Sequence, residues 1–385
     1  MMEDWRHGGF GLYLHWPFCA AKCPYCDFNS HVAAEIDITR WNRAYLSEID
    51  RIGELTKGRV LNTVFFGGGT PSLMPAELVA SLLDQIRATW PTANDLEITL
   101  EANPTSAEAG RFRGYADAGV NRLSMGIQAL NDDDLRRLGR LHSVAEAERA
   151  FGIARDTFER VSFDLIYARQ GQTLAEWRAE LTRALHMAVD HFSLYQLTIE
   201  DGTAFGARHA AGKLRGLPSE DLSADMYLIT QDICEAAGLP AYEVSNHARP
   251  GMESRHNLIY WRYGDYAGIG PGAHGRLTLN GIKTATDTPK APLRWLEMVE
   301  THRSGEVLAE PVPTQDQALE YLMFGLRLRE GIDTGRYARL AGQALDADAI
   351  HEMADLGLLD PSPGQLRATR EGRAVLDAIL RRLFP

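Results

Sequence analysis

FGLYLHWPFCAAKCPYCDFNSH, residues 10–31, joins an apolar run to three closely spaced cysteines. The run at 10–16 predicts a buried β-strand, because short apolar segments of this length are typical of strands in a sheet core. Cys19, Cys23 and Cys26 then form a C-x3-C-x2-C motif on what we expect to be a loop. Chemically active side chains placed just after a strand are typical of α/β proteins, whose sites lie at the carboxyl ends of parallel strands.

Five further apolar runs follow this strand, with amphipathic stretches between them. The stretches at 75–90 and 173–187 each begin with a residue suited to a helix start and carry apolar residues at i, i+3 and i+4 spacing. Six consecutive βα units predict a parallel sheet, either doubly wound or barrel-like. The expected strands are 10–16, 60–66, 96–102, 121–127, 160–167 and 192–199.

Polar residues at the strand ends favour the barrel. Glu101, Gln128 and Asp164 lie at or near the ends of three predicted strands, and Gly67 to Thr70 directly follow another. A doubly wound sheet would gather such residues at one crevice, whereas a barrel presents them around its top face. We therefore predict an α/β fold with an incomplete parallel (β/α)6 TIM-like barrel over residues 8–240.

The rest of the chain differs in character. Residues 241–290 are rich in glycine, histidine and aromatic residues, and we expect structured loops and short strands there. This segment contains the motif HNLIYW at 256–261. Residues 291–385 are dominated by helical patterns, which predict a small C-terminal helical domain of winged-helix-like type.

The composition of the 385-residue chain narrows the function classes. A formal net charge of −12 argues against a broad nucleic-acid surface, which needs clustered Lys and Arg. No apolar run reaches the roughly 18 residues of a membrane helix, and the N-terminus lacks the apolar stretch of a signal peptide. We expect a cytoplasmic protein with no integral membrane segment and no nucleic-acid partner. The fourth cysteine, Cys234, lies alone in a helical pattern and is expected in a helix core.

The cysteine motif favours an iron–sulfur cluster over zinc. Three thiolates on one loop can bind three irons of a 4Fe–4S cluster and leave the fourth iron free for a small molecule. A zinc knuckle would need a fourth Cys or His at ligand spacing, for which His15 and His31 are the nearby candidates. Tyr25, the aromatic residue before the last cysteine, adds to the specificity of the pattern.

The run YLHWPFCAAKCPYCDFNSH resembles the radical-SAM superfamily and, within it, the branch of coproporphyrinogen III dehydrogenases and HemW-type heme chaperones. The resemblance implies that the open iron of the cluster binds S-adenosylmethionine. FFGGGTP at 65–71 is by itself weak evidence for a ligand site, because a glycine-rich segment between a strand and a helix is often only a turn, and it lacks the lysine of a phosphate loop. It nevertheless resembles the family's GGGTP motif, which lines the methionine end of S-adenosylmethionine.

The resemblance extends to residues on several strands. It implies that S-adenosylmethionine is held by Tyr13, Tyr25, Gly68, Gly69, Thr70, Glu101, Gln128, Arg140 and Asp164. Read alone, Glu101 could instead cap a helix and Arg140 could be one more surface charge. Asp164 is harder to explain in that way, because a carboxylate between Phe163 and Leu165 is costly to bury without a partner. The loop after Tyr167 departs from the family's Gly-Leu-Pro and reads Ala168, Arg169, Gln170.

Two positions separate the members of the branch. The dehydrogenases carry a further cysteine where this chain has Phe28, and the chaperones carry an HNxxYW motif that matches HNLIYW. The resemblance implies a heme chaperone with His256 as a heme ligand, although spacing alone would favour an ordinary loop histidine. The heme-acceptor protein is not identified by the sequence, and no residue is assigned a catalytic role.

Two other function classes remain open at this point. One is an oxygen-independent coproporphyrinogen III oxidase or dehydrogenase, an activity that Phe28 predicts to be absent. The other is a radical-SAM enzyme acting on an unrelated substrate, in which HNLIYW would be purely structural. Whether S-adenosylmethionine is cleaved in the physiological cycle is not determined by the sequence.

Overall fold

A central mixed β-sheet organises the molecule, whose computed structural model describes residues 3–33 and 35–384. Within these residues the sheet has eleven strands in the order β13-β12-β11-β10-β1-β4-β5-β6-β7-β8-β9. Six neighbouring strands in its middle run parallel and follow the order of the chain. They are β1 (Phe10–Trp16), β4 (Leu61–Gly68), β5 (Thr92–Ala102), β6 (Arg122–Gln128), β7 (Arg160–Tyr167) and β8 (His191–Gln196).

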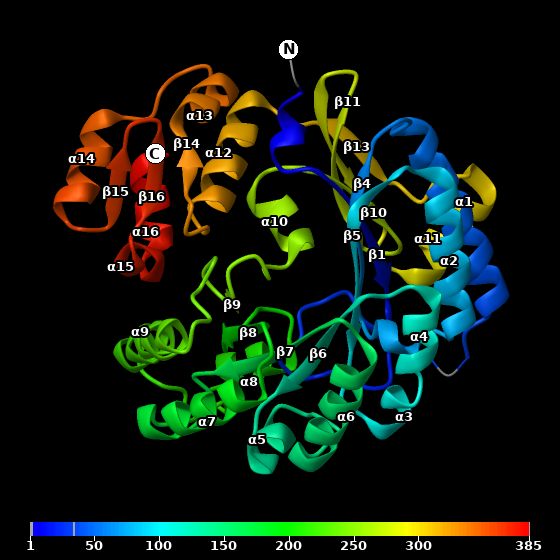
Figure 1. Ribbon diagram of the computed structural model, residues 1–385, viewed down its shortest axis with the longest axis horizontal. Helices are drawn as coiled ribbons and strands as arrows, with labels where there is room; N and C mark the ends of the chain where they lie inside the picture. Colours follow the sequence, from blue (N-terminus) through cyan, green and yellow to red (C-terminus); the bar gives the residue numbers. More distant parts are fainter. Residues whose placement is uncertain (1–2, 34, 385) are drawn as a thin grey trace.

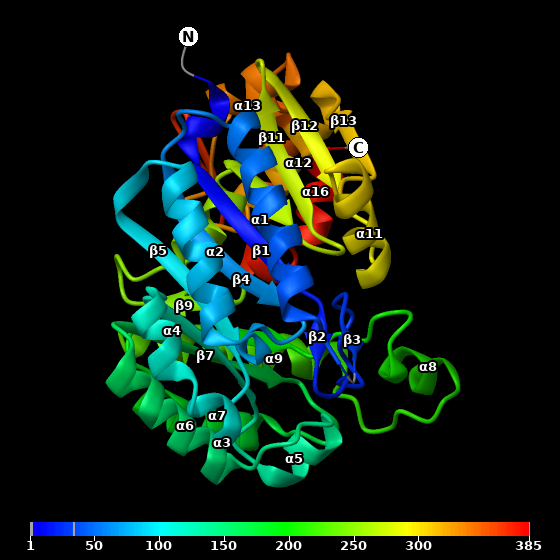
Figure 2. The same cartoon turned by 90° about the vertical axis from the view of Figure 1, so that its right-hand side faces the viewer.

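The connections between these strands carry helices on the outer side of the curved sheet (Figures 1 and 2). The six predicted βα units are therefore confirmed. Capping boxes begin two of the helices, with Ser143 paired to Glu146 and Thr173 paired to Glu176. The helices of the units are α1 (Ile38–Leu55), α2 (Ala76–Thr89), α4 (Phe112–Ala118), α6 (Val144–Thr157), α7 (Leu174–Met187) and α9 (Glu220–Ala236).

The sheet does not close on itself. On one side β9 (Asn246–Ala248) pairs antiparallel with β8, and on the other β10 (Asp265–Ile269) pairs parallel with β1. Beyond β10 the strands β11 (His274–Leu279), β12 (Ile282–Asp287) and β13 (Leu308–Pro311) are antiparallel. The result is the predicted incomplete barrel, opened at the side where residues 241–290 lie (Figure 1).

The prediction of loops and short strands for residues 241–290 is wrong for the HNLIYW motif, which forms helix α10 (Arg255–Trp261). The Ser254 side chain caps this helix by accepting a hydrogen bond from the Asn257 backbone N–H. The helix places His256 and Tyr260 one turn apart on the same face, because residues i and i+4 are neighbours on a helix surface.

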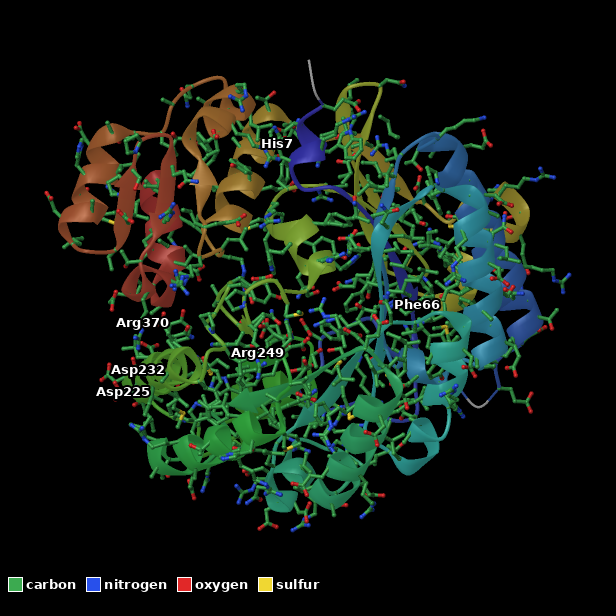
Figure 3. The ribbon with its side chains drawn as sticks, in the orientation of Figure 1. His7, Phe66, Asp225, Asp232, Arg249 and Arg370 are labelled. Atoms are coloured by element: carbon green, nitrogen blue, oxygen red, sulfur yellow. The ribbon has the colours of Figure 1, made fainter. Side chains whose placement is uncertain are left out.

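The C-terminal part forms a second, smaller core of helices and a three-stranded sheet, β14-β16-β15. Arg370 in this part pairs with Asp232 of α9 at 2.6 Å, and Figure 3 shows the two side chains facing each other. Its elements are α12 (Thr314–Gly325), β14 (Ile332–Asp333), α13 (Thr334–Ala341), α14 (Ala347–Asp355), β15 (Leu359–Ser362), β16 (Gln365–Ala368), α15 (Arg370–Ala374) and α16 (Leu376–Leu383).

The main core lies between the sheet and its outer helices. Trp90, Trp177 and Trp295 are among its largest fully buried side chains, and Trp295 belongs to α11 (Pro292–His302). Cys234 is buried in α9, as predicted. No helix among the described residues is long and apolar enough to cross a membrane. The remaining short elements are η1 (Asp4–His7), β2 (Phe18–Cys19), β3 (His31–Val32), η2 (Pro71–Leu73), α3 (Ser106–Ala109), α5 (Asp132–Arg137) and α8 (Ala204–Ala210).

Candidate cofactor site and adjoining chamber

The cysteine loop follows β1 and is closed at its base by the pairing of two short strands, β2 and β3. Phe18 and His31 pair at its base, where β2 meets β3, and the His31 backbone N–H donates to the Pro17 carbonyl at 2.7 Å. The three thiols that it carries are partly exposed. They open onto a cavity of about 150 Å³ at the carboxyl ends of the central strands, which we call the cofactor cavity.

Most of the predicted site residues meet in the cofactor cavity. Its lining includes Asn103, which the sequence did not single out although it directly follows the strand that carries Glu101. Residues from β4, β5, β6, β7 and the loop after α5 thus converge on the three cysteines. The predicted residues in its lining are Cys19, Cys23, Tyr25, Cys26, Gly68, Gly69, Thr70, Glu101, Gln128, Arg140 and Asp164.

Hydrogen-bond donors already point at two of the thiols. The Thr70 hydroxyl donates to Cys19 Sγ at 3.3 Å, and Arg140 donates to Cys23 Sγ at 3.4 Å. Arg140 also donates to the Gly126 carbonyl at 2.8 Å, which fixes its guanidinium beside the loop. Burial raises the pKa of Cys19. Positive charge and hydroxyl donors at the sulfur atoms are the environment that stabilises thiolates bound to iron.

The two histidines nearest to the motif are engaged elsewhere. His15 bonds the Tyr13 hydroxyl at 3.0 Å and the Asn29 carbonyl at 2.8 Å, and His31 bonds the Asn29 side chain at 3.0 Å. Across residues 3–33 and 35–384, no three His, Cys, Asp or Glu side chains are gathered closely enough to hold one metal ion. The three thiolates of a 4Fe–4S cluster do not have to meet at one metal ion, because each binds a different iron.

The glycine turn after β4 brings backbone against the cysteine loop. Gly68 has φ of +112°, and a Cβ at this position would lie 2.6 Å from the His15 ring. A Cβ on Gly69 would lie 2.8 Å from the Phe18 carbonyl oxygen. Both positions therefore require glycine for close packing between β4 and the loop. Gln128, the last residue of β6, has φ of +73°, a left-handed conformation that is uncommon outside glycine, and it lines the cofactor cavity.

Two carboxyl groups lie buried in the cofactor cavity. Burial and the neighbouring Asp164 raise the pKa of Glu101 to about 8. Burial raises the pKa of Asp164 to about 6. Glu101 accepts one backbone hydrogen bond, from Gly68 N–H at 3.3 Å, and it has no cationic side chain within ion-pair distance among the described residues. The pair is therefore suited to a cationic ligand, which would favour ionisation of both groups.

A larger chamber of about 640 Å³ adjoins the cofactor cavity, and Phe28, Ser30, Gly68 and Glu101 line both. We call the side shared with the cavity its floor. Its roof is formed by Tyr260 and Trp261 of α10 together with Phe324 of α12. Five lysine or histidine side chains also line it: His15, Lys22, His31, His274 and Lys290.

Two predicted residues lie outside the cofactor cavity. Tyr13 lines the chamber, where its hydroxyl meets His15, rather than the cavity itself. His256 lines neither space and is only 1% exposed. Its Nδ1 bonds the Thr63 hydroxyl at 2.7 Å, and its Nε2 bonds the Tyr260 hydroxyl at 2.7 Å. Its ring also stacks on Phe65, with centroids 5.0 Å apart.

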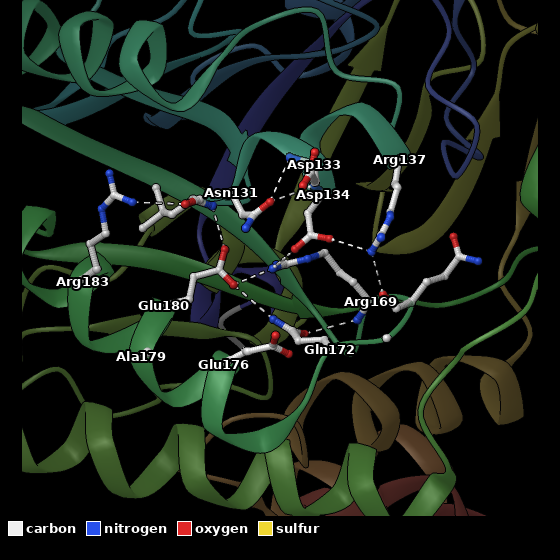
Figure 4. A pocket seen from close by; sticks show the side chains of 13 residues that line it. Asn131, Asp133, Asp134, Arg137, Arg169, Gln172, Glu176, Ala179, Glu180 and Arg183 are labelled. Carbon is white, nitrogen blue, oxygen red and sulfur yellow. Dashed lines mark hydrogen bonds and ion pairs between the residues drawn. The ribbon is translucent and has the colours of Figure 1, made fainter.

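The loop that departs from the family pattern contains a buried ion network (Figure 4). Arg169 pairs with Asp134 of α5 at 2.9 Å and with Glu180 of α7 at 2.5 Å. Glu180 in turn accepts a hydrogen bond from the Leu130 backbone N–H at 2.7 Å. The altered residues therefore tie the β7–α7 loop to the segment that leads to Arg140.

Comparison with known proteins agrees with this geometry. The Radical SAM superfamily profile matches residues 13–184, and the HemN C-terminal domain profile matches residues 312–375. The coproporphyrinogen III oxidase HemN from Escherichia coli, described as a radical SAM enzyme, superimposes with a TM-score of 0.81 at 22% identity. It covers 98% of this chain and 90% of its own, and this likeness shows a shared fold.

Full-length relatives are more similar in sequence. The heme chaperone HemW of Haemophilus influenzae is 38% identical over 96% of both chains, and that of Escherichia coli is 37% identical over 96% of both. The mouse radical S-adenosyl methionine domain-containing protein 1, mitochondrial, is 37% identical over 97% of this chain and 87% of its own. With such identity along nearly its whole length, the chain belongs to the radical-SAM superfamily and, within it, to the family of the heme chaperone HemW.

Proposed function

We propose that this protein binds heme in the chamber beside the cofactor cavity and transfers it to an acceptor protein in the cytoplasm. The observation that carries the proposal is the chamber itself. Its volume of about 640 Å³ suits a ligand of heme size, since small-molecule pockets span roughly 300–1,000 Å³. Aromatic side chains form its roof and could pack on a porphyrin, while Lys22 and Lys290 could meet the propionates.

Membership of the radical-SAM superfamily implies a 4Fe–4S cluster and S-adenosylmethionine, and the residues of the cofactor cavity fit both. Cys19, Cys23 and Cys26 would hold the cluster, with Thr70 and Arg140 as donors to two of the sulfur atoms. Glu101 and Asp164 would meet the cationic part of S-adenosylmethionine, and the backbone of Gly68 and Gly69 would allow close approach. Gln128 and Tyr25 complete this proposed lining. Together the two groups supply one-electron chemistry when bound.

The resemblance to the chaperones implies His256 as a heme ligand. Direct ligation of iron by this residue would require the Tyr260 hydroxyl to move away from Nε2, because both ring nitrogens are already hydrogen-bonded. The geometry thus places His256 behind the roof rather than in it.

Anaerobic titration with heme tests the function. The purified protein with its cluster should bind about one heme per chain and pass it to an added apoglobin. Phe324→Ala, which removes part of the roof, should weaken binding. Phe384→Ala is the matched control, because this residue packs on the same C-terminal core and does not line the chamber. Failure of the wild-type protein to bind heme would refute the proposal.

The alternative is an oxygen-independent coproporphyrinogen III oxidase. Phe28 is 59% exposed and stands where the chamber meets the cofactor cavity, in the position of the dehydrogenases' additional cysteine. We expect no conversion of coproporphyrinogen III to protoporphyrinogen IX in the presence of S-adenosylmethionine and a reductant. Turnover by the pure protein would assign it to the enzyme class.

A further inference from the structure

The middle of the cysteine loop, from Cys23 to Cys26, is held by two segments that lie far from it in the chain. The first is the segment after α5. Its Arg140 donates to Cys23 Sγ at 3.4 Å, and a Cβ on Gly139 would lie 2.6 Å from Pro24 Cδ. The backbone of Gly139 therefore packs directly against the cysteine loop, at a distance that only glycine allows.

The second contact comes from α8, in the segment of residues 197–219 between β8 and α9. Phe205 lies in the first turn of this helix, where backbone N–H groups are free of intrahelical partners, and its N–H donates to the Pro24 carbonyl at 2.8 Å. Its ring centroid lies 6.4 Å from that of Tyr25. Phe205 is 1% exposed, although α8 stands out from the body of the molecule beside β2 and β3 (Figure 2). This residue thus anchors α8 on the cysteine loop.

A short loop between β7 and α7, residues 168–172, holds the first of these segments, and we call it the bracing loop. Arg169 of this loop pairs with Asp134 of α5 at 2.9 Å. The Arg140 backbone N–H donates to the carbonyl of Leu135, in the same helix, at 2.9 Å. Arg140 is therefore tied to α5, and a shift of this helix would move the guanidinium away from its thiol.

The bracing loop also holds the segment that carries α8. The Gly171 backbone N–H donates to the Gly216 carbonyl at 2.6 Å, and Gln170 Nε2 donates to the Arg215 carbonyl at 2.6 Å. Both carbonyls lie where the segment returns toward α9. The five residues of the bracing loop thus make contacts with both segments that hold the cysteine loop.

We propose, on the basis of the proposed cluster site, that the bracing loop positions the cysteine loop for the iron–sulfur cluster by holding α5 and the α8 segment. Arg169, Gln170 and Phe205 are positioning residues, because their side chains lie outside the lining of the cofactor cavity. A loop that is already held in place loses less conformational freedom when its three thiolates bind the cluster. Loss of either contact should therefore speed the loss of the cluster, even where the overall fold persists.

A chelator challenge of the full-length protein with its reconstituted cluster tests the proposal. An iron chelator is added anaerobically, the cluster absorbance is followed with time, and the free energy of unfolding of each variant is measured alongside. Phe205→Ala should lose the cluster about tenfold faster than wild type, and Phe205→Leu should restore most of the difference. Phe158→Ala is the matched control and should keep the wild-type rate, since this buried residue precedes β7 and lies at the amino ends of the strands.

Two variants of the bracing loop complete the test. Arg169→Ala should also lose the cluster about tenfold faster than wild type, through the displacement of α5. Gln170→Ala removes one exposed hydrogen bond and leaves the buried ion pairs of Arg169 intact. It should therefore fold like wild type and still lose the cluster faster, by a smaller factor. Hydrogen exchange of the cluster-free protein gives a second measurement, in which residues 20–26 should exchange faster in both variants.

Three outcomes contradict these expectations in different ways. Equal rates of cluster loss in Phe205→Ala and Phe158→Ala would overturn the proposal, because cluster loss would then follow general stability. Wild-type hydrogen exchange of residues 20–26 in Arg169→Ala would overturn it as well, because the bracing loop would then not hold the cysteine loop. A wild-type protein that takes up no 4Fe–4S cluster would instead refute the cluster site on which the proposal rests.

Discussion

The floor and the roof of the chamber differ in how their polar groups are satisfied. On the floor, the carboxylate of Glu101 accepts one long backbone hydrogen bond and lies beside a second buried carboxyl group, Asp164. Behind the roof, both nitrogens of His256 have partners at 2.7 Å. Buried polar groups without full partners are costly, and they persist where a ligand completes them. The floor is therefore built to receive a charged cofactor, whereas the hydrogen bonds of the His256 ring are complete within the protein.

The surroundings of the cofactor cavity and of the roof also differ in the burial of their ion pairs. The Arg169 network, which holds the segment leading to Arg140 of the cofactor cavity, lies buried, with only 4% of the arginine side chain exposed. The C-terminal part, which supplies Phe324 to the roof, is attached in part by solvent-exposed pairs such as Arg370–Asp232, whose side chains are 30% and 64% exposed. Exposed pairs contribute little to stability. We therefore expect the attachment made by Arg370 and Asp232 to yield more readily than the buried Arg169 network.

The largest expected effect is on the iron–sulfur cluster of the cofactor cavity, below the floor of the chamber. Replacing Cys19, Cys23 or Cys26 with alanine should abolish the 4Fe–4S signal of anaerobically reconstituted protein, because each thiolate holds a different iron. Iron and sulfide analysis with optical spectroscopy measures this. Cys234→Ala is the matched control and should keep the cluster, since this thiol is buried in α9. Zinc in place of iron would contradict the prediction.

The next largest effect tests the buried fastening. Arg169→Ala leaves Asp134 and Glu180 without their shared cation and should destabilise the protein by about 3 kcal/mol. Chemical unfolding, followed by circular dichroism, measures the loss. Arg136→Ala removes an exposed pair with Asp133 on α5, the helix that also carries Asp134. This variant should lower the free energy of unfolding by less than about 1 kcal/mol. Equal losses of unfolding free energy in the two variants would show that the buried network contributes no more to stability than an exposed ion pair.

A smaller effect concerns the protonation of the floor. The pKa of Glu101 is raised to about 8 and that of Asp164 to about 6. Each group must therefore lose its proton before it can bind a cation as a carboxylate. Affinity for S-adenosylmethionine should therefore fall as the pH drops from 8 to 6, by at most about tenfold per pH unit for each group. Calorimetry on the reconstituted protein gives the affinities and the protons released.

Two variants separate the contributions of the carboxyl groups. Glu101→Gln should bind S-adenosylmethionine more weakly at pH 8 and should lose most of the dependence between pH 7 and 8. Asp164→Asn should mainly change the lower part of the range. The ionisation of S-adenosylmethionine itself is common to all three proteins, so an unchanged profile in Glu101→Gln would remove Glu101 from the site.

The smallest effect is expected at the attachment of the roof. Arg370→Ala should reduce the free energy of unfolding by less than about 1 kcal/mol, with a smaller loss at high salt, because the pair with Asp232 is partly exposed. Hydrogen exchange in α9 and α15 should increase nonetheless. Arg382→Ala removes an exposed pair with Glu352 inside the C-terminal part and should leave exchange in α9 unchanged. Faster exchange of α9 in both variants would contradict the proposed attachment.

The sequence alone determined the barrel and most of the cofactor cavity. Six apolar runs separated by amphipathic stretches predicted the six parallel strands, because hydrophobic periodicity reflects which face of an element is buried. In a parallel sheet the carboxyl ends of all strands lie at the same edge. Residues at strand ends, such as Glu101 and Gln128, therefore had to converge with the cysteine loop, however far apart they lie in the chain.

Only the tertiary structure decided the roles of the remaining residues. HNLIYW reads as a compact motif, but the folded chain splits it between a buried histidine and a tyrosine that lines the chamber. Thr63 of β4 bonds the buried histidine, and Phe324 of α12 lines the chamber with the tyrosine. Both come from distant parts of the chain, and no local pattern specifies such contacts. Arg169 likewise appeared as a departure from a family motif, and its two buried carboxylate partners were visible only after folding. Local sequence sets which elements form, whereas side-chain burial and pairing depend on how those elements pack.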